Sequence, residues 1–159
     1  MDVTVERCAA LDVHKKTVMA AVRTPGPDGA RRQQVKEHST YTEGLIALRD
    51  WLVAEGVTQV AMEATGVYWR PVWHVLEEVA SFELLLVNPR HVKNLPGRKT
   101  DVKDAEWLVQ LLECGLLRGS FVPPREIQRL RDLTRYRTKW CGSGLVRCSA
   151  SRSCSKTPG

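Results

Sequence analysis

Two short apolar segments, each preceded by a helical pattern, constrain the fold of this chain more than any other feature. They are VTQVAMEA at 57–64 and FELLLV at 82–87. Their length and their aliphatic, partly β-branched content favour strands that are buried on both faces. Such strands need crossover connections, and the preceding segments predict helices over 43–55 and 68–80. Pro71 fits the second helix because a proline in the first turn removes no helical hydrogen bond.

The first forty residues have a different pattern. VERCAAL at 5–11 leads to Asp12 and a short polar turn, and TVMAAV at 17–22 follows, which predicts an antiparallel hairpin. The segment 24–31 is dense in proline and glycine and is expected to be a loop. QQVKEHSTY at 33–41 alternates weakly and predicts a third, edge strand. The order of elements therefore indicates an α/β protein with a mixed five-stranded sheet flanked by helices.

The segment GRKTDVKDAEWLVQLLECGLL at 97–117 predicts a helix that begins with two acids. Thr100 can cap this helix, which would then start at about Asp101. Asp101 and Asp104 are three residues apart, so both carboxylates project from the same side of the first turn. Such a pair either complements the helix dipole or holds a hard cation against a phosphate. The helix presents one apolar face made by Trp107, Leu108, Leu111 and Leu112.

Two further acids are expected near this helix. Asp12 ends the first strand, and Glu63 lies at the carboxyl end of the fourth, which neighbours the first in a sheet of this order. Four converging carboxylates repel one another unless cations neutralise them, and two Mg²⁺ ions would do so. The structural alternatives stay open: Asp12 as an ordinary turn residue, and Glu63 in a salt bridge to Arg70 or at a hydrated strand end.

The last part of the chain changes character. EIQRLRDLTRYRTK at 126–139 predicts a further helix, whereas the residues from Trp140 onward are rich in serine, glycine and cysteine and poor in large apolar side chains. We therefore expect a catalytic domain over 1–139 and a disordered tail over 140–159.

The net charge of +6 indicates an anionic partner. The residues of this chain that we expect to contact a nucleic acid are Lys15, Arg90, Lys93, Arg98, Lys99, Lys103, Arg129 and Arg135.

The alternative interpretation of the basic residues on the last helix is that they form an ordinary solvated surface.

No apolar run is long enough for a membrane span, and the amino terminus lacks the pattern of a signal peptide. We therefore expect a cytoplasmic protein with no membrane partner.

Four segments together resemble a known family. LDVHKKTV, MEATGVYWRPVWHVLEE, LLLVNPRHVKNLPGRKTDVKDAEWLVQLLECGLL and FVPPREIQRLRDLTRYRTK are similar to the amino-terminal domain of the DEDD transposases of the insertion-sequence one-ten family. Pilin-gene-inverting recombinases share this domain, and the resemblance covers about residues 7–139. It implies a RuvC-like ribonuclease H fold. It also implies that Asp12, Glu63, Asp101 and Asp104 are the catalytic acids and the ligands of Mg²⁺ or Mn²⁺.

The resemblance implies a function in DNA recombination. Family members insert or invert a mobile element, in many cases with a guide RNA from that element, and the full-length proteins are expected to be homo-oligomers. The family pattern also includes a coiled-coil segment and a carboxy-terminal domain with a nucleophilic serine, which this sequence does not contain. We therefore expect a truncated transposase whose own enzymatic activity is an open question. The alternative is a catalytically inactive DNA- or RNA-binding remnant, or a regulator of a full-length transposase.

Overall fold

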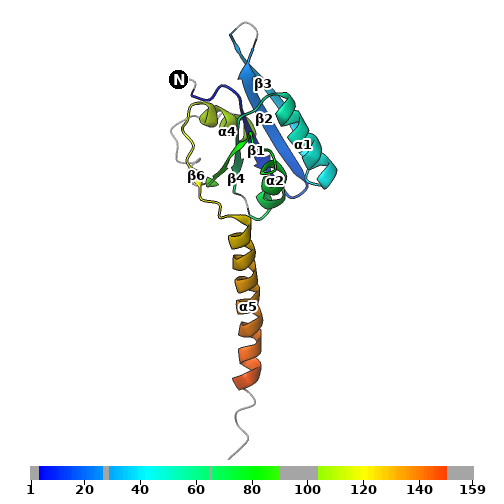
Figure 1. Ribbon diagram of the computed structural model, residues 1–159, viewed down its shortest axis with the longest axis vertical. Helices are drawn as coiled ribbons and strands as arrows, with labels where there is room; N and C mark the ends of the chain where they lie inside the picture. Colours follow the sequence, from blue (N-terminus) through cyan, green and yellow to red (C-terminus); the bar gives the residue numbers. More distant parts are fainter. Residues whose placement is uncertain (1–3, 27–28, 65, 90–103, 150–159) are drawn as a thin grey trace, which may run out of the picture. The chain divides into compact units, whose positions relative to one another are not determined.

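The computed structural model describes residues 4–26, 29–64, 66–89 and 104–149, with side chains described as far as residue 141. The chain divides into two compact units, Met1–Phe121 and Val122–Gly159. The first unit contains all the strands among the described residues (Figure 1).

A six-stranded mixed sheet is the centre of the first unit, in the order β3-β2-β1-β4-β5-β6. The strands are β1 (Cys8–Val13), β2 (Thr17–Pro25), β3 (Arg31–Ser39), β4 (Gln59–Glu63), β5 (Glu83–Val87) and β6 (Gly119–Ser120). β2 pairs antiparallel with both β1 and β3, β4 runs parallel to both β1 and β5, and β6 is antiparallel to β5. This order and these directions are those of the ribonuclease H-like fold, so the predicted fold class is confirmed. The sixth strand was not predicted because its two residues are too few for a periodic pattern.

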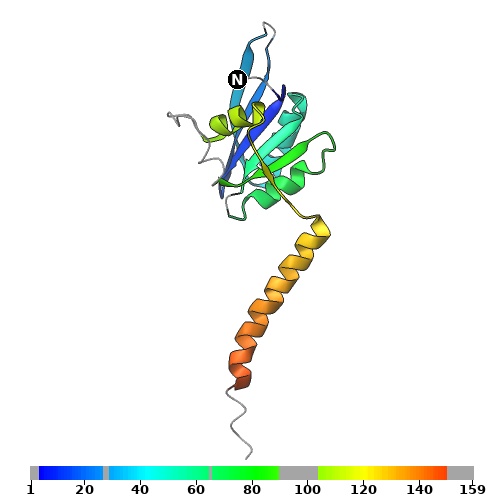
Figure 2. The ribbon, with the colours of Figure 1, turned by 90° about the vertical axis from the view of Figure 1, so that its left-hand side faces the viewer.

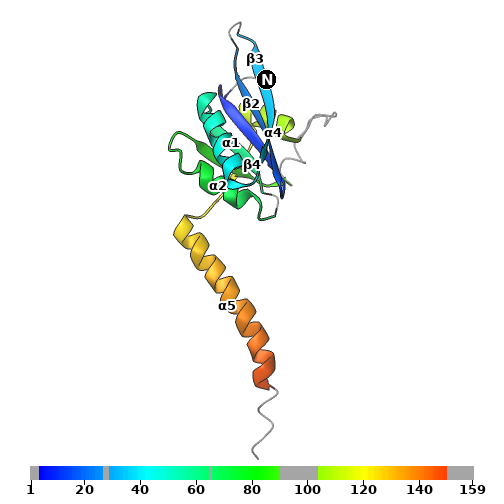
Figure 3. The same ribbon diagram turned by 90° about the vertical axis from the view of Figure 1, so that its right-hand side faces the viewer.

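Two helices, α1 (Thr42–Ala54) and α2 (Trp69–Leu76), cover one face of this sheet (Figure 3). Their buried side chains include Leu48 and Leu52 of α1 and Leu76 of α2, all with no exposed surface. Gly56 ends α1 as predicted, because its φ of 66° lets its amide donate to the carbonyl of Val53. Both helices begin within a residue of the positions expected from the sequence, and α2 ends earlier.

The helix α4 (Asp104–Glu113) covers the opposite face (Figure 2). Small side chains dominate this interface: Ala10 of β1, Ala61 of β4 and Ala105 of α4 are at most 1 % exposed. They allow the helix to approach the sheet closely, and Leu108 and Leu112 fill the remaining space in the same cluster. The residues expected to start this helix, from Thr100, lie outside the described residues.

The second unit contains the helix α5 (Arg125–Ser149). The predicted boundary at Lys139 falls inside this helix, so the expectation of a tail without regular structure is wrong for residues 140–149. A run of serine, glycine and cysteine lowers intrinsic helix propensity but does not prevent the continuation of an established helix. Residues 150–159 lie outside the described part. In the described segments, none of the helices combines the length and the apolar character that a bilayer span requires.

Candidate functional site

The first two predicted acids lie on adjacent strands. In the parallel pairing of β1 with β4, Leu11 is opposite Met62, so Asp12 and Glu63 occupy the next position on each strand. Residues at the same register of neighbouring parallel strands project from the same face, about 4.8 Å apart along the hydrogen-bonding direction. Asp12 is half-buried, and Glu63, the last residue of β4, is also half-buried. The sheet therefore places Asp12 and Glu63 at adjacent positions of neighbouring strands, facing the same side.

The face from which these acids project is the face that α4 covers. Successive strand residues alternate between faces, and Ala10 and Ala61, two positions before Asp12 and Glu63, belong to the cluster packed on α4. The helix runs in the opposite general direction to β1. Val109, in the middle of α4, accepts a hydrogen bond from the thiol of Cys8 at the start of β1, at 3.9 Å, and the carbonyl of Glu113, the last residue of α4, accepts one from the amide of Thr4, which precedes β1, at 2.9 Å. The amino end of α4 is thus directed toward the strand ends that carry the acids.

The remaining two acids are described only in part. Asp104 is the first residue of α4 and is exposed, whereas Asp101 lies outside the described residues. Among the described segments, no group of three or more histidine, cysteine, aspartate or glutamate side chains is arranged to hold a metal ion. Asp12 and Glu63 are therefore the predicted acids that the described structure brings together.

The turn between β1 and β2 adds polar groups beside Asp12. The imidazole Nε2 of His14 lies 3.0 Å from Oδ2 of Asp12, and 59 % of the His14 side chain is exposed. Lys15 is exposed at the tip of this turn, where its backbone carbonyl accepts a hydrogen bond from the hydroxyl of Thr40 at 3.0 Å. The turn was predicted from the sequence, and its anchoring to the residue after β3 was not.

The basic residues predicted to contact nucleic acid lie partly inside and partly outside the described residues. Arg129 and Arg135 lie on α5 and are exposed, and Arg135 is 3.8 Å from Asp132 one turn earlier. The helix α5 belongs to the second unit, whereas Asp12 and Glu63 belong to the first. Five predicted basic contacts lie outside the described residues: Arg90, Lys93, Arg98, Lys99 and Lys103.

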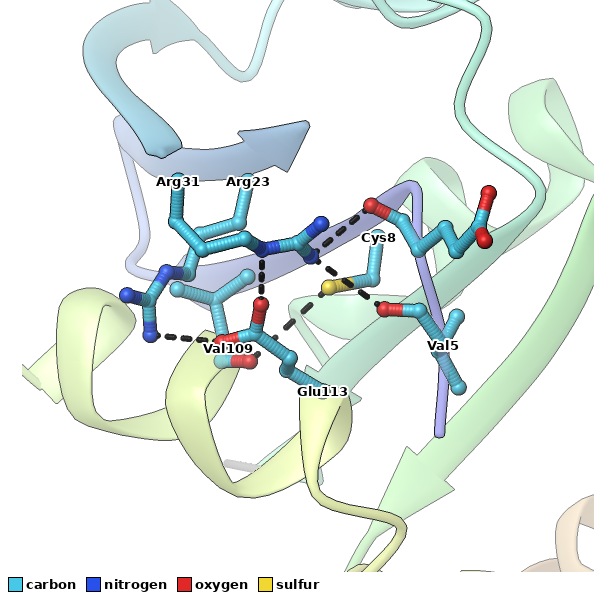
Figure 4. A network of polar contacts seen from close by, with 7 residues as sticks. Val5, Cys8, Arg23, Arg31, Val109 and Glu113 are labelled. Carbon is cyan, nitrogen blue, oxygen red and sulfur yellow. Dashed lines mark hydrogen bonds and ion pairs between the residues drawn. The ribbon is translucent and has the colours of Figure 1, made fainter. Parts of the chain in front are cut away.

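The structure contains one buried ionic cluster that the sequence reasoning missed (Figure 4). The side chain of Glu113, at the end of α4, is 6 % exposed; its Oε2 lies 2.8 Å from the Arg23 guanidinium of β2, and its Oε1 pairs with Arg31 of β3. Burial, with the Glu113 charge as a second cause, raises the pKa of the adjacent Cys8 thiol to about 11. A sequence signal existed: Glu113 follows Val109 by four residues and so falls on the apolar stripe, where an acid needs a buried partner.

The topology defines a class, the ribonuclease H-like α/β domains, here with carboxylates at two neighbouring strand ends. The family model of the IS110-type DEDD transposases, described as "Transposase", matches residues 9–143. The chain therefore belongs to this transposase family, and the resemblance found from the sequence is confirmed. A function in DNA recombination follows from this membership.

Among solved structures, the chain is similar to Holliday junction resolvases. A Thermus thermophilus RuvC in complex with its Holliday junction substrate is 12% identical, with 72% of this chain and 99% of that chain covered and a TM-score of 0.46. A second Thermus thermophilus RuvC structure is 14% identical, covering 73% of this chain and 84% of that chain at a TM-score of 0.44. The fowlpox virus resolvase is 9% identical, with 58% and 65% covered and a TM-score of 0.42. A comparison with curated proteins gives no significant match.

Proposed function

We propose that this chain carries the metal-dependent DNA-cleaving domain of a transposase, with Asp12, Glu63, Asp101 and Asp104 as its acidic residues. The observation that supports the proposal most is the parallel register of β1 and β4, which puts Asp12 and Glu63 side by side on the face covered by α4. The amino end of α4, which begins with Asp104, is directed toward the same strand ends.

The chemistry of these side chains fits a hard divalent cation. Carboxylate oxygens are the ligands that Mg²⁺ prefers, and Mn²⁺ accepts the same donors. When bound, such ions activate the attacking oxygen and stabilise the leaving oxygen of a phosphodiester. In this proposal, Asp12 and Glu63 hold these ions at fixed positions on the sheet. The part of Lys15, exposed in the adjacent turn, is to neutralise a phosphate of the DNA backbone.

DNA is the proposed partner. The net charge of +6 favours a polyanion, and the exposed Arg129 and Arg135 on α5 are proposed to contact phosphates. The five basic residues between 90 and 103 keep the same proposed role. A guide RNA, homo-oligomerisation and a cytoplasmic location stay predictions.

The test is Mn²⁺ titration by calorimetry together with cleavage of a labelled DNA duplex. We expect Mn²⁺ to bind to the unaltered chain, and Asp12→Asn and Glu63→Gln to weaken that binding at least tenfold, because each removes one anionic ligand. The matched control is Glu83→Gln. Glu83 is an exposed acid at the opposite end of the parallel strands, where it accepts a hydrogen bond from Gln59 at 2.6 Å. This substitution is expected to leave Mn²⁺ affinity within about twofold.

Two outcomes would contradict the proposal. Absence of Mn²⁺ binding by the unaltered chain, or equal effects of Glu63→Gln and Glu83→Gln, would refute the metal site. Salt-dependent DNA binding without any metal-dependent cleavage would favour the alternative, a nucleic-acid-binding remnant or a regulator of a full-length transposase.

A further inference from the structure

One residue receives most of the polar contacts that fasten the carboxyl end of α4. The carboxylate of Glu113 pairs with Arg23 and Arg31, whose side chains are 19% and 20% exposed. The backbone carbonyl of Glu113 also accepts hydrogen bonds from the amides of Thr4 and Val5, at 2.9 and 3.1 Å. Figure 4 shows the side chains of Arg23 and Arg31 converging on the Glu113 carboxylate. Glu113 is thus linked at once to β2, to β3 and to the segment before β1.

Arg31 extends this linkage beyond the ion pair. Its Nη2 donates to the carbonyls of Glu6 at 2.8 Å and Val5 at 3.3 Å. The guanidinium therefore joins the Glu113 carboxylate to the segment that leads into β1. The contact of Arg31 with Glu113 is an ion pair, so the directional part of this junction comes from the charge-assisted hydrogen bonds that Arg31 donates to the two carbonyls.

Where the described part of α4 faces the sheet, its contacts are mostly apolar. Apart from the weak thiol contact of Cys8, the buried part of this interface consists of Ala10, Ala21, Ala61, Val87 and the apolar side chains of the helix, and partly buried side chains that include Met19, Val35 and Leu85 pack against it. Apolar packing is non-directional, and alanines offer low ridges, which leave the position of a helix along a sheet weakly determined. The described contacts that specify this position are concentrated at Glu113.

We propose that Glu113 is a positioning residue that sets the axial register of α4 and thereby the location of Asp104 relative to Asp12 and Glu63. This inference rests on the proposed function for its catalytic meaning. Asp104 lies nine residues before Glu113, about 13 Å along the helix axis, so a fixed carboxyl end determines where the amino end stops. A slip of one residue moves Asp104 by about 1.5 Å and turns it by about 100°, which is enough to separate ligands of one ion.

The experiment compares Glu113→Gln and the milder Glu113→Asp with a control on the same helix. Glu106→Gln removes an acid that is closer to Asp104 but outside the ionic cluster, so it reports any simple effect of charge. Mn²⁺ affinity is measured by calorimetry at a temperature where circular dichroism shows every variant folded. We expect Glu113→Gln to weaken Mn²⁺ binding about tenfold, in the range for residues that orient metal ligands, and Glu113→Asp to weaken it less. Glu106→Gln is expected to stay within about twofold.

Hydrogen exchange on the metal-free protein tests the same inference independently of the metal site. In Glu113→Gln, the amides of residues 108–112 are expected to lose at least tenfold more protection than those of residues 9–11 in β1. Equal losses in helix and strand, or Mn²⁺ binding by Glu113→Gln that equals that of the unaltered chain, would overturn the positioning role. If the unaltered chain binds no Mn²⁺, the proposed function fails, and the exchange result alone decides whether Glu113 sets the helix position.

Discussion

The docking of α4 on the alanine face can be tested by removing one side chain, Leu108. This leucine is 2% exposed and lies in the cluster with Ala61 and Leu112. Leu108→Ala deletes the equivalent of three methylene groups, which at about 0.8 kcal/mol each amounts to about 2.4 kcal/mol of lost transfer free energy. An unfilled cavity adds about 1 kcal/mol, because the alanines opposite have no flexible side chains with which to fill it. The expected loss in unfolding free energy is therefore about 3 kcal/mol.

The assay is urea denaturation followed by circular dichroism, with the thermal midpoint as a second measure. A loss of about 3 kcal/mol corresponds to a fall of roughly 12 °C for a folding unit of this size. Val53→Ala is the control, because Val53 on α1 is 50% exposed and its truncation should change stability by no more than about 0.5 kcal/mol. A loss below about 1 kcal/mol for Leu108→Ala would refute the docking of α4 against the sheet, and with it the direction assigned to the start of that helix.

Two further predictions concern titrating groups. Because the pKa of the fully buried Cys8 is raised to about 11, this thiol should resist iodoacetamide at pH 8 while the exposed Cys141 reacts, as peptide mass spectrometry can measure. Burial, with a smaller contribution from Lys36, lowers the pKa of His38 from 6.5, so the unfolded chain binds its proton more readily than the folded chain does. Stability should therefore fall as pH drops below about 6.5, and His38→Gln should reduce that slope in denaturation at several pH values.

The sequence predicted five of the six strands and the four described helices because their signals are local. The apolar run that became β4 and the hairpin of β1 with β2 are both readable from spacing and turn residues alone. The position of Glu63 at the end of β4 followed in the same way. Local signals misled at Trp140, where a change in composition suggested the end of a helix that in fact continues to Ser149.

The Glu113 cluster could not be predicted because it depends on two features of the tertiary structure. The pairing of Glu113 with Arg23 requires the rotation of α4, and its pairing with Arg31 requires the register of β2 against β3, in which Arg31 lies opposite Pro25. Neither the rotation nor the register has a signal in a single stretch of sequence. The acid on an apolar stripe indicates that a partner exists, but not which residue it is.

The order of elements along the chain has a consequence for synthesis. On the ribosome, β1, β4 and β5 are all complete before α4 is translated. The sheet face that carries Ala10 and Ala61 is therefore not yet covered by α4 during that interval. A nascent sheet face of large aliphatic side chains would be adhesive during that interval, whereas alanines expose little apolar area. The same small residues that let α4 pack closely on the sheet in the finished protein thus also limit misassociation of the unfinished one.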